Sequence, residues 1–138
     1  MNRIRVLLAD DHPDFLSAVS RLLETEYEVV QTVADGQAAI DEATRLNPDL
    51  LVLDISMPVL NGIEAAKQLK AAGFAGKIVF LTVHADADYV QATRAIGAQG
   101  YVVKSRLASD LLPTLREVSA GGSITSTNMV PAALQSDR

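Results

Sequence analysis

Short apolar runs alternate along the chain with longer segments in which apolar residues recur every three or four positions. We predict strands in the apolar runs, which cover residues 4–10, 27–33, 50–54, 77–83 and 100–104. We predict amphipathic helices in the segments between and after them, at residues 13–24, 35–46, 62–73, 86–97 and 109–122. This alternation predicts an α/β protein with one parallel sheet, right-handed crossovers and helices on both faces.

Individual residues indicate where some strands lie in the sheet and where some helices begin. The unbroken apolar run at 50–54 is typical of a central strand that is buried on both faces, whereas the polar residues within 27–33 favour an edge strand. Asp35 is a predicted helix cap. Pro113 falls in the first turn of the last helix if Asp110 is its N-cap, and it interrupts the hydrogen-bond ladder if the helix begins earlier.

Composition narrows the class of protein. The chain of 138 residues is the size of one domain, it has no cysteine, and its net charge of −5 comes without any basic run. Nucleic-acid binding by this chain alone is therefore not expected, whereas divalent cations or basic partners suit it, unless the charge serves only solubility. No apolar stretch approaches about 18 residues, so we expect no membrane span and a cytoplasmic location.

Polar residues follow four of the five predicted strands. Asp10 and Asp11 follow the first, Asp54 the third, Thr82 the fourth and Lys104 the fifth. Because ligands bind at the carboxyl edge of an open parallel sheet, we expect these side chains to gather there.

Carboxylates gathered in such a cluster repel one another unless a positive charge lies among them. Two like charges 4 Å apart repel by about 4 kcal/mol at an effective dielectric near 20. A divalent ion bound through oxygens, with Mg²⁺ the best fit, would offset the carboxylates; alternatively, Asp10 and Asp11 only cap the first helix. Beside a metal and an ammonium group, Asp54 could be a nucleophile that accepts a phosphoryl group. Lys104 and the Thr82 hydroxyl would then stabilise that group, although each is also an ordinary surface lysine or strand-ending residue when taken singly.

Four segments together resemble a known family: "ADDHP" (9–13), "LDISMPVLNGIE" (53–64), "LTVH" (81–84) and "GYVVKS" (100–105). In order and spacing they are similar to the receiver domain of bacterial two-component response regulators, most closely the NarL/FixJ (LuxR-type) subfamily. The resemblance spans residues 4–122. It implies a flavodoxin-like fold, a doubly wound five-stranded parallel sheet with strand order 2-1-3-4-5.

The resemblance also implies a chemistry. Asp54 would take a phosphoryl group from the phosphohistidine of a sensor histidine kinase. Mg²⁺ would be bound directly by Asp11, Asp54 and the backbone carbonyl of Ser56, and through water by Asp10. The chain would then be a phosphoacceptor regulator and not an enzyme, promoting only its own phosphorylation and dephosphorylation.

In such a switch, Lys104 would pair with the phosphoryl group, Thr82 would move toward it and Tyr101 would change rotamer. The output surface would be residues 86–121, with homodimer formation on phosphorylation, to which the helix at 13–24 could contribute. Apart from the resemblance, Tyr101 is interpreted as a half-buried strand aromatic.

Several loop residues next to these motifs carry expectations of their own. Pro58 and Gly62 would shape the loop after the third strand, with Gly62 supplying a conformation that other residues resist. Val83 is bulkier than the small residue common at this position and would narrow access to the phosphoryl group. His12 and His84 are expected to be solvent-exposed loop residues.

The last residues differ from the rest. Residues 123–138 are rich in Ser, Thr and small residues, so we interpret 1–122 as the receiver domain and 123–138 as a linker or C-terminal extension. NarL/FixJ proteins continue into a helix-turn-helix domain, which would bind DNA and control transcription but is absent from this chain. The alternative is a stand-alone receiver that acts through protein–protein contacts or in a phosphorelay.

Two other classes share features with the sequence. A flavin-binding electron carrier has the same fold class, but it needs a Ser/Thr/Gly-rich phosphate loop where this chain has "DDHPD". An Asp-nucleophile phosphatase would carry a second acid two residues after Asp54, where Ser56 stands.

Overall fold

The computed structural model describes residues 3–122 and 124–125. Its strands and helices alternate as the apolar pattern predicts. The strands are β1 (Arg5–Ala9), β2 (Glu28–Val33), β3 (Leu50–Leu53), β4 (Lys77–Thr82), β5 (Gly100–Val103) and β6 (Ile124–Thr125). The helices are α1 (Pro13–Leu23), α2 (Gly36–Leu46), α3 (Gly62–Ala71), α4 (Ala87–Ile96) and α5 (Leu107–Ser119), with a 3₁₀ turn at Lys104–Arg106 before α5.

The strands form one sheet in the order β2-β1-β3-β4-β5-β6, and every neighbouring pair is parallel. The predicted flavodoxin-like order 2-1-3-4-5 is therefore confirmed. A short sixth strand, β6, follows α5 and pairs with β5, with Gly100 opposite Ile124 and Tyr101 opposite Thr125. It falls within the segment that we interpreted as a linker or extension, of which residues 123 and 126–138 lie outside the described part of the chain.

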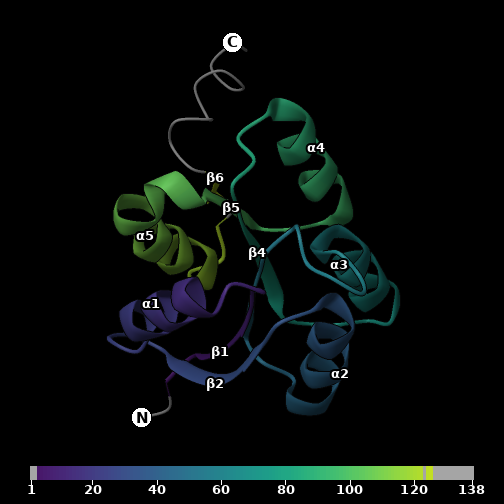
Figure 1. Cartoon of the computed structure of the whole chain (residues 1–138), viewed down its shortest axis with the longest axis horizontal. Coiled ribbons are helices and arrows are strands. Elements are labelled where there is room, and N and C mark those ends of the chain that lie inside the picture. Colours follow the sequence, from purple (N-terminus) through teal and green to yellow (C-terminus); the bar gives the residue numbers. More distant parts are fainter. Residues whose placement is uncertain (1–2, 123, 126–138) are drawn as a thin grey trace.

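Helices cover both faces of the sheet, with α1 and α5 on one side and α2, α3 and α4 on the other (Figure 1). Because side chains alternate along a strand, neighbouring residues of one strand serve opposite cores. Leu51 and Phe80 pack toward α2, α3 and α4, whereas Val52 and Leu81 pack toward α1 and α5. All four residues of β3 are buried, and β2 is a half-exposed edge, as predicted.

Helix ends follow the sequence signals at most places. Asp35 caps α2, since its Oδ1 accepts a hydrogen bond from the Ala38 amide at 2.7 Å. Asn47 and Gly97 end α2 and α4 in the left-handed region, with φ of 49° and 101°. Within the described residues, no helix combines the length and apolar character that a membrane crossing requires.

The start of α5 differs from the expectation. The helix begins at Leu107, because the 3₁₀ turn after β5 leads directly into it. Asp110 is therefore not the N-cap but lies within the first turn, where its carboxylate accepts a hydrogen bond from Arg106 Nε at 3.0 Å. Pro113 lies inside the helix and has no amide to donate to the Ser109 carbonyl, so the ladder lacks one bond there.

Candidate functional site

Two carboxylates stand at the carboxyl edge of the sheet because their own amides continue its hydrogen-bond ladder. The Asp10 amide donates to the Val33 carbonyl at 3.0 Å, and the Asp54 amide donates to the Ala9 carbonyl at 2.9 Å. Asp10 is 1% exposed and Asp54 3% exposed. Adjacent strands therefore hold both acids rigidly, out of water and on the same edge.

Lys104 brings the counter-charge. It follows β5, and its Nζ lies 2.7 Å from Asp10 Oδ2 and 3.3 Å from Asp54 Oδ2. Its side chain is only 10% exposed. Since β4 lies between β5 and β3, and β3 lies between β4 and β1, the lysine side chain reaches past one strand to Asp54 and past two to Asp10. The predicted meeting of Asp10, Asp54 and Lys104 is observed in the structure.

A single ammonium group does not fully offset this charge. Burial raises the pKa of Asp54, and the Asp10 carboxylate raises it further, while Lys104 and a hydrogen bond from the Ser56 amide lower it. The net effect is a pKa above the ordinary value for an aspartate. The site therefore favours added positive charge.

Asp11 completes an acidic cluster. Ligand atoms of Asp10, Asp11, His12 and Asp54 all lie within 4.8 Å of one another. Asp11 Oδ1 is buried and accepts no well-aligned hydrogen bond within the described part of the chain, although His12 Nδ1 lies 3.2 Å from it. Mg²⁺ is usually bound through one or two carboxylates and keeps several waters, so the residues present fit this ion.

Neither Asp10 nor Asp11 caps α1 through a side-chain hydrogen bond. The N-cap of α1 is His12, and no side chain caps the helix. Asp10 Oδ1 instead accepts a hydrogen bond from the His12 amide at 2.9 Å. The His12 side chain is 64% exposed, as expected, but its Nδ1 lies 3.1 Å from Asp10 and 3.2 Å from Asp11, a contact that sequence reasoning missed.

The loop after β3 holds Asp54 from the other side. The Ser56 amide donates to Asp54 Oδ1 at 3.3 Å, and an open cavity of about 470 Å³ is lined in part by Asp11 and Ser56. A Cβ on Gly62 would lie 2.0 Å from the Asp54 carbonyl oxygen. Gly62 is thus required for close approach and not for the unusual backbone conformation that we expected, since its φ is not positive. Positive φ occurs in this loop at Val59, with φ of 69°.

The β4–α4 loop joins Thr82 to Tyr101 through one residue. Thr82 is fully buried, and its Oγ1 accepts a hydrogen bond from the His84 amide at 3.1 Å. The Tyr101 hydroxyl donates to the His84 carbonyl at 2.8 Å, and burial raises the pKa of Tyr101 and keeps it neutral. Tyr101 is 2% exposed, more buried than its position suggested.

His84 is not the exposed loop residue that we expected. It is half-buried, and its ring stacks on Tyr89 with centroids 4.2 Å apart and planes 15° apart. Its Nε2 lies 3.4 Å from Ser56 Oγ, so it also reaches the loop after β3. Val83 beside it is 67% exposed.

Residues 6–116 match the family described as the response regulator receiver domain, and the chain belongs to this family. The resemblance that the four segments carry is thereby confirmed. The receiver domains of response regulators are regulatory.

Individual relatives place the chain in the NarL/LuxR-type group. It is 37% identical over 123 residues to the transcriptional regulatory protein DegU of Brevibacillus brevis, covering 88% of this chain and 52% of DegU. It is 33% identical over 138 residues to the nitrate/nitrite response regulator protein NarL of Escherichia coli K12, covering 96% of this chain and 64% of NarL. The chain thus spans between about half and two thirds of these relatives.

A solved structure agrees with the fold. The crystal structure of a LuxR-family two-component response regulator from Aurantimonas sp. SI85-9A1 superposes with a TM-score of 0.92. The two chains are 28% identical, and the match covers 99% of each.

Proposed function

We propose that this receiver domain is a phosphorylation-controlled switch in which Asp54 accepts a phosphoryl group from the phosphohistidine of a sensor histidine kinase. The observation that carries the proposal is the setting of Asp54: a buried carboxylate, 3.3 Å from the Lys104 ammonium and in one cluster with Asp10 and Asp11. The family membership of the chain supports the same role.

The transfer needs one new bond and one broken bond. An Asp54 oxygen attacks phosphorus as the P–N bond to the kinase histidine breaks, and the histidine nitrogen keeps the electron pair. Lys104 offsets the negative charge of the phosphoryl oxygens, and Thr82 donates its hydroxyl hydrogen to one of them. The chain turns over no separate substrate in this scheme.

Mg²⁺ would be held by Asp11, Asp54 and the backbone carbonyl of Ser56, and through water by Asp10. The support for this assignment is the gathering of the carboxylates of Asp10, Asp11 and Asp54 within one cluster. When bound, the ion supplies positive charge that offsets the charge of the phosphoryl group.

The signal would leave the site through His84. Thr82 Oγ1 accepts a hydrogen bond from the His84 amide and the Tyr101 hydroxyl donates one to the His84 carbonyl, so a movement of the Thr82 oxygen toward the phosphoryl group would break the first of these bonds. Loss of that bond frees the β4–α4 loop to move and Tyr101 to change rotamer. The output surface is then the face formed by residues 86–121.

The output itself would be transcriptional. The relatives named above are a transcriptional regulatory protein and a nitrate/nitrite response regulator, and the chain spans only part of each. DNA binding would belong to a domain outside this chain, with a phosphorylation-dependent homodimer as its active form. The alternative is a stand-alone receiver that acts through protein contacts or in a phosphorelay.

Incubation with acetyl phosphate and Mg²⁺ followed by intact mass spectrometry tests the central proposal. The wild type should gain one phosphoryl group, and Asp54→Ala should gain none. Asp49→Ala is the matched control, because Asp49 is an exposed acid at the opposite edge of the sheet and its loss should leave the gain intact. Sustained hydrolysis of a phosphomonoester, or an equal gain in Asp54→Ala, would contradict the proposal.

A further inference from the structure

The Lys104 ammonium has a third neighbour besides its two carboxylates. The ring of Phe15 lies against it, with the ring centroid 4.3 Å from Nζ. Phe15 is in the first turn of α1, directly after the loop that carries Asp10 and Asp11, and it is partly buried against the core beneath α1 and α5. One aromatic ring therefore closes a side of the ammonium that neither acid covers.

The contact with Phe15 matters because the flexible lysine side chain does not by itself fix the position of its ammonium group. Its ammonium ends a flexible four-carbon stem and forms hydrogen bonds as a point charge without a fixed fork. Asp10 Oδ2, at 2.7 Å, is the nearer of the two carboxylates and Asp54 Oδ2, at 3.3 Å, the farther. Without the ring, water would occupy the side of the ammonium that neither carboxylate covers. The higher dielectric would weaken the interaction of the ammonium with the charged groups of the site.

We propose that Phe15 is a positioning residue, whose ring face holds the Lys104 ammonium between Asp10 and Asp54, where it meets the incoming phosphoryl group. The attraction is that of a cation for the negative face of an aromatic ring. The inference rests on the proposed phosphorylation of Asp54, in which Lys104 offsets the charge of the transferred group.

A simple packing role for Phe15 is the competing explanation. The apolar face of α1 already buries Val19 and Leu23 completely, and an aliphatic residue at position 15 would continue that face equally well. The two explanations differ in what they require of the side chain, since packing needs apolar volume, whereas positioning needs a π face.

The experiment compares Phe15→Leu with Phe15→Tyr in the full chain. The rate of phosphorylation by acetyl phosphate at saturating Mg²⁺ is followed by intact mass, and thermal unfolding verifies that each variant is folded. Phe15→Leu should be about 3- to 10-fold slower, the range that a partly desolvated cation–π contact supports. Phe15→Tyr, which keeps the ring, should stay within about 2-fold of wild type. Leu16→Ala, on the same helix, should lower the unfolding midpoint without changing the rate.

A double-mutant cycle with Lys104→Met makes the test specific. If the ring acts through the ammonium, Phe15→Leu has no further effect in the Lys104→Met background. An equal slowing in both backgrounds, or an unchanged rate in Phe15→Leu, overturns the positioning role while wild-type phosphorylation still stands. A wild type that gains no phosphoryl group at all overturns the proposed function first, so the two failures are distinguishable.

Discussion

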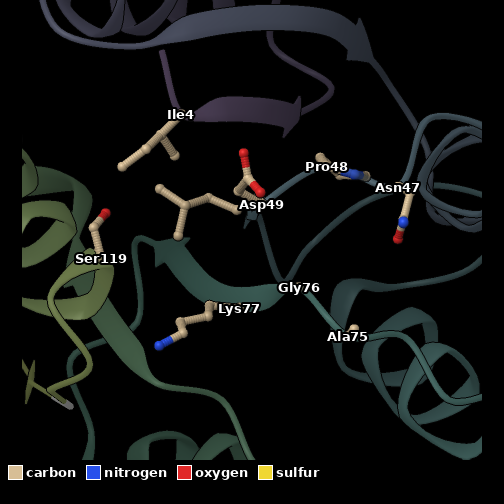
Figure 2. Close-up of a pocket in the computed structure, with 9 residues that line it drawn as sticks. Ile4, Asn47, Pro48, Asp49, Ala75, Gly76, Lys77 and Ser119 are labelled. Atoms are coloured by element: carbon tan, nitrogen blue, oxygen red, sulfur yellow. The ribbon is translucent and has the colours of Figure 1, made fainter. Parts of the chain in front are cut away.

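The two edges of the sheet both carry charged residues and a cavity, yet they differ in how the charges are used. At the amino edge, a hollow of about 360 Å³ is bordered by Asp49 and Lys77 (Figure 2). The Asp49 carboxylate accepts a hydrogen bond from the Arg5 amide at 2.9 Å, and Lys77 Nζ donates to the Val118 carbonyl at 3.3 Å. Each charge there is bound to the backbone of a neighbouring element.

At the carboxyl edge, the charges face one another. Asp10 and Asp54 both lie beside the Lys104 ammonium, and Asp11 joins them in a cluster whose ligand atoms lie within 4.8 Å of one another. The volume of the hollow does not separate the two edges. The balance of charge does, because three carboxylates gather beside one ammonium group at the carboxyl edge, whereas the hollow at the amino edge is bordered by one acid, Asp49, and one lysine, Lys77.

The largest expected effect is on the free energy of unfolding, and it comes from a side chain added at Gly62 next to the Asp54 backbone. Gly62→Ala places a methyl group against the Asp54 carbonyl, a backbone atom that cannot turn aside, so we expect a loss of about 3 kcal/mol in the free energy of unfolding. Gly73→Ala is the control, since no atom lies within 4 Å of its added methyl group and only its φ of 88° opposes the change. Urea unfolding measures both, and equal losses would show that close approach at Gly62 is not what matters.

Magnesium should separate the two edges directly. At a concentration 100-fold above the dissociation constant, a ligand that binds only the folded state stabilises it by about 2.7 kcal/mol. We expect the unfolding midpoint of the wild type to rise with Mg²⁺ and to fall back when EDTA removes it. Asp11→Asn should lose most of this response, and Asp49→Asn should keep it. A response that survives in Asp11→Asn would contradict the assigned site.

A smaller effect is expected at the hydroxyl that ties β5 to the β4–α4 loop. Tyr101→Phe removes the donor to the His84 carbonyl and should cost about 1 to 2 kcal/mol in unfolding free energy. Tyr89→Phe keeps the ring that stacks on His84 and should cost less. If the two substitutions cost the same, the Tyr101 hydroxyl does not hold the loop.

The smallest effect concerns an exposed ion pair toward the amino edge. A hydrogen bond from Arg116 lowers the pKa of Glu26 below its ordinary value of 4.5. A lowered pKa in the folded state adds stability above the ordinary pKa, and this is lost as pH falls through the folded pKa. Glu26→Gln should therefore unfold slightly more easily than wild type at pH 7, and the difference should vanish well below pH 4 in urea titrations. A difference that grows in acid would contradict this sign.

Much of the site could be predicted from the sequence because a single rule of sheet topology determines where its residues lie. In a parallel sheet all strands end at the same edge, so Asp10, Asp54 and Lys104 can be brought together from their positions after apolar runs. What the rule does not specify is which acid the ammonium favours. That choice depends on side-chain rotamers across β1, β3 and β5, and neither the shorter distance to Asp10 nor the ring of Phe15 has a signal in the chain order.

Short and irregular segments were the harder part of the fold. A strand of two residues such as β6 is too short to show an alternating pattern. The start of α5 was predicted too late because the 3₁₀ turn before it has no periodicity of its own. The role of Gly62 was misjudged for a related reason: a glycine in the sequence does not reveal whether its backbone angle or its lack of a side chain is what the fold requires.

The direction of β6 brings the end of the described chain close to Tyr101. Because β6 runs parallel to β5, it points toward the edge at which Asp54 stands, with Thr125 level with Tyr101. The polypeptide therefore passes beside the strand that carries Tyr101, and a displacement of β6 acts on a strand that is hydrogen-bonded directly to β5.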